Sequence, residues 1–103
     1  MHVFSDIVNC SWRHASATVD ASATLTNSVV DSDCVVGAHV VLEEAVLLPG
    51  AIVQSNCVIR SSIIGPGAVI GRYSQLGATC VVGANVHVAP ASELSGEVRL
   101  GGV

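Results

Sequence analysis

The chain has 103 residues, half of them hydrophobic, with eight acidic residues, four arginines, no lysine and a net charge of −4. This length limits it to one domain, and the lack of a basic stripe argues against nucleic-acid binding. No apolar run reaches the roughly 18 residues of a membrane helix, and no basic region followed by an apolar block marks a secretory signal. We therefore expect a cytoplasmic protein with neither nucleic acid nor membrane as a partner.

Residues 1–12 do not fit the repeat that follows them. Their apolar residues follow no single period: Val3, Phe4, Ile7, Val8 and Trp12. They are interpreted as a cap over the first coil, because the open edge of a solenoid needs protection. A linker from a preceding domain is the alternative, and the sequence leaves both open.

In residues 13–103, aliphatic residues recur every 17 positions in steps of six, six and five, and the last full turn lengthens to 18 residues, from Ile64 to Val82. Three columns result: Val30, Leu47, Ile64, Val82 and Leu100, with Arg13 in the first place; Val19, Val36, Val53, Ile70 and Val88; and Leu25, Leu42, Ile59, Leu76 and Leu94. Six-residue repeats with an aliphatic lead are typical of a parallel β-helix. The sequence predicts an all-β fold of about five triangular coils built from such hexapeptide repeats, with short strands stacked at roughly 4.8 Å per coil.

Within each repeat, two further positions are assigned structural roles. Four residues after each lead we predict a second inward side chain, usually small, as at Cys34 and Ala51. In the five-residue steps, the fourth residue after the lead is larger, and the predicted inward residues there are Val29, Val46 and Ile63. Residues directly after a lead are interpreted as corner residues, because Gly and Asp tolerate the backbone angles of a sharp turn. They are Asp20, Asp31, Gly37, Gly65, Gly71, Gly77 and Gly83.

Three cysteines, Cys34, Cys57 and Cys80, are spaced 23 residues apart, which is one 17-residue coil plus one hexad. Each therefore falls in a small inward position on a different face. Buried free cysteines behave as small hydrophobic residues, and no C-x-x-C pair is present. We interpret them as core-filling side chains, in preference to a redox or metal role.

The histidines are the candidates for metal or base chemistry. His14, His39 and His87 are second, fourth and sixth in their hexads and fall on different coils, so a three-histidine zinc site within the chain is not predicted. The coil pattern is also similar to that of hexapeptide acyltransferases, a resemblance that implies a histidine base near a subunit interface. His39 or His87 could serve as that base, although neither has an evident partner and no extra loop interrupts the coils. A free-standing acyltransferase-like trimer is therefore the alternative function.

Arg60 and Arg72 are the anion-seeking side chains in the middle of the predicted prism. Arginine binds phosphate and carboxylate groups through paired hydrogen bonds. We predict an effector-binding role for both, and the alternative is that they are ordinary solvated arginines at corners.

Three segments resemble the C-terminal β-helix of sugar-1-phosphate nucleotidylyltransferases, the family of glucose-1-phosphate adenylyltransferase and mannose-1-phosphate guanylyltransferase. They are residues 27–36 (NSVVDSDCVV), 44–50 (EAVLLPG) and 60–67 (RSSIIGPG), and the similarity extends over residues 13–100. The resemblance implies left-handed winding, against the usual right-handed rule for parallel crossovers. It also implies that catalysis and Mg²⁺ belong to a separate catalytic domain, so no catalytic residue and no cofactor is assigned to this chain.

What the resemblance implies for this chain is an accessory role in nucleotide-sugar biosynthesis. The β-helix would pack against the nucleotidyltransferase catalytic domain, in cis or in trans, and form a homo-oligomer. The reaction of the parent enzyme would join a nucleoside triphosphate and a sugar 1-phosphate to give an NDP-sugar and pyrophosphate. A purely structural oligomerisation module is the third interpretation.

Overall fold

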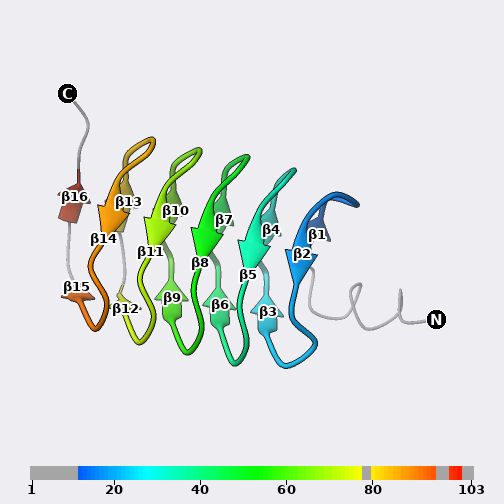
Figure 1. Ribbon diagram of the computed structural model, residues 1–103, viewed down its shortest axis with the longest axis horizontal. Helices are drawn as coiled ribbons and strands as arrows, with labels where there is room; N and C mark the ends of the chain where they lie inside the picture. The colour runs from blue at the N-terminus through cyan, green and yellow to red at the C-terminus, as the bar shows by residue number, and fades with distance from the viewer. Residues whose placement is uncertain (1–11, 78–79, 95–97, 101–103) are drawn as a thin grey trace.

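The computed structural model describes residues 12–77, 80–94 and 98–100. Its strands, two or three residues long, form three parallel sheets around a common core (Figure 1). Sheet A contains β1 (Trp12–Arg13), β4 (Val29–Val30), β7 (Val46–Leu47), β10 (Ile63–Ile64), β13 (Cys80–Val82) and β16 (Val98–Leu100). Sheet B contains β2 (Thr18–Val19), β5 (Val35–Val36), β8 (Ile52–Val53), β11 (Val69–Ile70) and β14 (His87–Val88). Sheet C contains β3 (Thr24–Thr26), β6 (Val41–Glu43), β9 (Val58–Arg60), β12 (Gln75–Leu76) and β15 (Glu93–Leu94).

The strand pairing confirms the predicted parallel β-helix and the register of its three columns. Val30 pairs with Leu47 in sheet A, Val36 with Val53 in sheet B, and Leu42 with Ile59 in sheet C. We predicted about five coils. Each of the two shorter sheets holds five strands, and because five strands enclose four intervals, about four full turns separate its first strand from its last. The cap or linker predicted for residues 1–12 lies outside the described residues, apart from Trp12 in β1.

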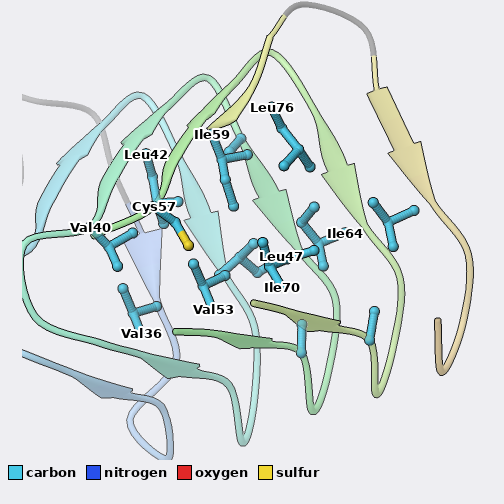
Figure 2. Close-up of a cluster of buried hydrophobic side chains, with 14 of the residues drawn as sticks. Val36, Val40, Leu42, Leu47, Val53, Cys57, Ile59, Ile64, Ile70 and Leu76 are labelled. Carbon is cyan, nitrogen blue, oxygen red and sulfur yellow. The ribbon is translucent and has the colours of Figure 1, made fainter. Parts of the chain in front are cut away.

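The core is a column of aliphatic side chains that point inward from all three sheets (Figure 2). The lead residues of the middle coils are 0–2% exposed, among them Leu42, Leu47 and Val53. Each coil buries its leads against the coils on either side of it, and removal of this apolar surface from water is the main stabilising contribution.

The inward residues predicted for the five-residue steps are wrong. Ile63 is 44% exposed on the outer face of β10, whereas Ser62 beside it is buried. Neighbouring residues of a strand point to opposite faces, so the second inward residue lies two positions before each lead. In a six-residue step, the fourth residue after one lead is also two positions before the next lead. In a five-residue step, the fourth residue is only one position before the next lead, and it therefore points outward. The inward residues at these steps are Ser28, Ala45 and Ser62 in place of Val29, Val46 and Ile63.

The role predicted for the glycines after the leads is also wrong. At the corners that connect sheet A to sheet B, the left-handed backbone lies three residues after the lead, two residues beyond the predicted position. There φ is +59° at Asp33, +78° at Gly50 and +71° at Gly67. The glycines after the leads are needed because consecutive coils touch there. A Cβ at Gly65 would lie 2.7 Å from the backbone of Gly83, and one at Gly71 would lie 2.5 Å from Pro90 N.

Candidate functional site

Arg60 ends β9 at the corner between sheets C and A, and its charge is already paired. Its Nε lies 3.0 Å from Oε1 of Glu43, the residue in the same register on the neighbouring strand β6. The two side chains are 59% and 45% exposed, so this ion pair contributes little to stability. It nevertheless reduces the capacity of Arg60 to attract another anion.

A hollow of about 190 Å³ opens beside Arg60 on the outer face of sheet C. It is lined by Val58, Arg60, Gln75, Leu76, Gly77, Glu93 and Leu94. Glu93 is an acidic residue of the hollow itself, and the carboxylate of Glu43 is paired with Arg60. An anionic ligand would meet like charge at this place.

Arg72 lies at a different corner, between β11 of sheet B and β12 of sheet C. It lines a hollow of about 290 Å³ together with Val35, Gly37, Ile52, Val53, Gln54 and Ser55. Its backbone N–H donates to Oε1 of Gln54 at 3.2 Å. Arg60 and Arg72 thus belong to separate hollows, and their predicted effector-binding role stays a prediction.

The three histidines among the described residues, His14, His39 and His87, lie on different coils. His14 follows β1 and its Nδ1 is 2.9 Å from Oγ of Ser16, His39 is exposed at a corner with φ +59°, and His87 is exposed in β14. Within residues 12–77, 80–94 and 98–100, no group of three or more His, Cys, Asp or Glu side chains is placed to hold a metal ion.

Cys34, Cys57 and Cys80 are all buried, with 0–1% exposure, which confirms the predicted core-filling role. The thiol of Cys34 donates to the carbonyl oxygen of Leu48 and that of Cys57 to the carbonyl oxygen of Gly71, both at 3.1 Å. Burial raises the pKa of both these thiols above the ordinary value. They are therefore protonated at neutral pH and unsuited to nucleophilic chemistry.

The hydroxyls of two first-coil serines, Ser16 and Ser22, accept backbone hydrogen bonds from the second coil, a role that the sequence did not predict. The Ser22 hydroxyl donates to Oδ2 of Asp20 at 2.5 Å and accepts the backbone N–H of His39 at 2.8 Å. The hydrogen bonds from the Ser22 hydroxyl and N–H lower the pKa of Asp20. The Ser22 hydroxyl proton is directed to the Asp20 carboxylate and not to the His39 imidazole. Ser22 and His39 therefore lack the geometry of a catalytic serine–histidine pair. The available signal was the repeated x-Ala-Ser-Ala sequence at residues 14–17 and 20–23.

No helix in the described part of the chain is long and apolar enough to span a membrane.

The sequence model of one family matches residues 4–94. It is described as the EIF2B subunit epsilon LbH domain, where LbH denotes a left-handed β-helix. The chain belongs to this family. This membership confirms at the family level the predicted relation to the β-helix domains of nucleotidyltransferase-type proteins. No curated protein matches the chain significantly.

Two solved structures share the fold. The acetyltransferase domain of PglB from Neisseria gonorrhoeae FA1090, in complex with acetyl coenzyme A, has a TM-score of 0.65 at 24% identity over 84% of this chain and 52% of its own. A mutant of GDP-perosamine N-acetyl transferase from Caulobacter crescentus, in complex with CoA and GDP-perosamine, has a TM-score of 0.56 at 23% identity over 84% of this chain and 50% of its own. The chain spans about half the length of both. These likenesses establish the hexapeptide-repeat, left-handed β-helix fold.

Proposed function

We propose that this chain is the accessory β-helix domain of a nucleotidyltransferase-type protein and acts in assembly, not in the chemical step. The observation that carries the proposal is the family match over residues 4–94. We extend it to the synthesis of NDP-sugars from a nucleoside triphosphate and a sugar 1-phosphate, in the cytoplasm. In this proposal Mg²⁺ and the catalytic residues belong to the catalytic domain, and the β-helix holds neither.

The outer face of sheet A supports an assembly role. From β4 to β13 its outward column consists of the aliphatic residues Val29, Val46, Ile63 and Val81, and the register continues to Arg99 in β16. Ile63 in the middle of the column is 44% exposed. The corresponding column of sheet C ends in Gln75 and Glu93 instead. Aliphatic side chains on a sheet face release water when another surface covers them, so we propose that the catalytic domain packs here, with homo-oligomer formation as a further consequence of assembly.

The test is to recover the chain from its source cells with an affinity tag and to assay the eluate for nucleotidylyl transfer with Mg²⁺. We expect activity to co-purify with the natural chain and to be lost with Ile63→Arg. Gln75→Arg, an outward position on sheet C, is the matched control and should retain it. Absence of activity in every eluate would contradict the accessory role, and, where the catalytic domain is a separate chain, equal recovery with both variants would contradict its packing on sheet A.

The mass of the native product adds an independent measurement. An immunoblot band near 10.4 kDa would mean a free-standing β-helix, for which the accessory role requires a catalytic domain bound in trans. A band larger by about 100–250 residues would mean that it is joined in cis, and the assay should then use that protein.

The acyltransferase interpretation is separated from the accessory role by calorimetry with a CoA analogue. The accessory role predicts no binding heat. Saturable binding of the analogue to the chain alone would replace the accessory role with the acyltransferase interpretation.

A further inference from the structure

The hollow beside Arg72 on the outer face of sheet B differs from the hollow beside Arg60 in charge. None of its lining residues is acidic, although the chain as a whole carries a net charge of −4. Within the part of the chain that the structure describes, no carboxylate lies within ion-pair distance of the Arg72 guanidinium, whereas Arg60 is paired with Glu43. The positive charge of Arg72 is therefore available to a ligand.

Two further hydrogen-bond donors belong to residues that line the same hollow, Gln54 and Ser55. Oε1 of Gln54 accepts the backbone N–H of Arg72 at 3.2 Å. This contact orients the amide, whose Nε2 group donates to no other side chain or carbonyl among the described residues. Ser55, whose side chain carries a hydroxyl, also lines the hollow. A guanidinium, an amide N–H₂ and a hydroxyl together match the acceptor oxygens of a carboxylate or a phosphate.

The floor of the hollow is apolar. Val35, which is 40% exposed, and Ile52 are the outward residues of β5 and β8. Gly37 contributes no side chain that would cover them, and a Cβ there would lie 2.9 Å from Ser55 N. The volume of about 290 Å³ lies just below the range for small-molecule sites, roughly 300–1,000 Å³, and suits a small ligand.

We propose that this hollow, the Arg72 groove, binds a small organic anion whose carboxylate or phosphate group contacts Arg72, Gln54 and Ser55, with a short aliphatic part lying on Val35 and Ile52. Arg60 has no part in this site. The proposal is independent of the accessory role, because it concerns a different sheet face and a ligand of different size.

The test is a titration of the full chain followed by NMR of backbone amides and methyl groups, with butyrate and butyl phosphate as probes. We expect saturable shifts at the amides of Gln54, Ser55 and Arg72 and at the methyl groups of Val35 and Ile52. Arg72→Gln should weaken binding by at least about tenfold, since a charge-assisted hydrogen bond is lost. Arg60→Gln carries the same charge change at the paired arginine and should leave the affinity unchanged.

Two control ligands test the two halves of the site. Butylammonium retains the aliphatic part with the opposite charge, and inorganic phosphate retains only the anion; both should bind more weakly than butyl phosphate. The proposal is overturned if no saturable shift appears up to about 50 mM, if both arginine variants weaken binding equally, or if butylammonium or inorganic phosphate binds as well as butyl phosphate. A retained amide spectrum in both variants shows that they fold, so these outcomes report on binding and leave the accessory role untouched.

Discussion

The first coil and the middle coils have the same kinds of inward side chain but different degrees of burial. Val19 in sheet B is only partly buried, whereas Val36 and Val53 in the same column are 2% and 0% exposed. Leu25 and Leu42 differ in the same way in sheet C. The difference shows that burial in this fold depends on having a coil on both sides, because each coil of a solenoid contacts only its neighbours.

The corners differ between the two regions as well. In the middle coils the left-handed corner residue donates its N–H to a backbone carbonyl one coil earlier, as from Gly67 to Pro49 at 3.1 Å. At two of the three corners between the first and second coils, serine hydroxyls accept instead, whereas at the third the Glu44 N–H donates to the carbonyl oxygen of Thr26 at 2.9 Å. Asp33 N–H donates to Oγ of Ser16 at 2.9 Å, and His39 N–H donates to Oγ of Ser22 at 2.8 Å. The contacts between the first two coils are therefore more sensitive to side-chain substitution.

The largest expected effect is that of a charge placed in the middle of the core. Val53→Asp buries a carboxylate without a partner and should lower the free energy of unfolding by more than about 3 kcal/mol. Val19→Asp, in the same column of the first coil, should cost much less because water reaches the side chain. Urea denaturation of both variants measures the difference, and a soluble Val53→Asp chain of unchanged stability would refute the strand register.

A smaller effect is expected when a side chain is shortened. Leu42→Ala leaves a cavity between two coils and should cost about 2–5 kcal/mol. Leu25→Ala removes the same atoms from a partly exposed position, so its cost should lie below that range. Thermal unfolding of the two variants provides the measurement. Equal losses would mean that the first coil is as well covered as the middle ones.

The buried hydroxyl of Ser62 should contribute less than either aliphatic side chain. It donates to the carbonyl oxygen of Arg60 at 2.7 Å and lies 3.3 Å from that of Gly77. Ser62→Ala removes these hydrogen bonds, but Ala45 occupies the equivalent position one coil earlier, so the slot accepts a methyl group. We expect a loss of about 1 kcal/mol in chemical denaturation. A loss as large as that of Leu42→Ala would show that the hydroxyl organises the whole corner.

The smallest effect concerns pH and the first coil. Hydrogen bonds from Ser22 lower the pKa of the exposed Asp20 carboxyl in the folded state. The resulting stabilisation is present above the unfolded pKa, about 3.9, and is lost as pH falls through the lower folded value. Ser22→Ala should raise the pKa of Asp20 toward the ordinary value, as measured by NMR titration of its carboxyl group. An unchanged pKa in this variant would mean that another group stabilises the carboxylate.

The 17-residue spacing was sufficient to assign the fold and the three lead columns. Val30, Leu47 and Ile64 pair in the predicted register, because these coils have the same length of 17 residues and the stacking of equal coils aligns equal positions. The core role of the cysteines followed from the same arithmetic. The family relation was visible in the Asn-Ser and Pro-Gly corners.

Contacts between coils were decided only by the tertiary structure. Arg60 and Glu43 are one coil apart in the sequence, as are many other residue pairs. This spacing alone does not show that their side chains form an ion pair, or that the Arg72 guanidinium remains available to a ligand. In the same way, the need for glycine at Gly65 and Gly71 comes from the backbone of the next coil. Such properties depend on which atoms a neighbouring coil places within a few ångströms, and a repeat period contains no information on those atoms.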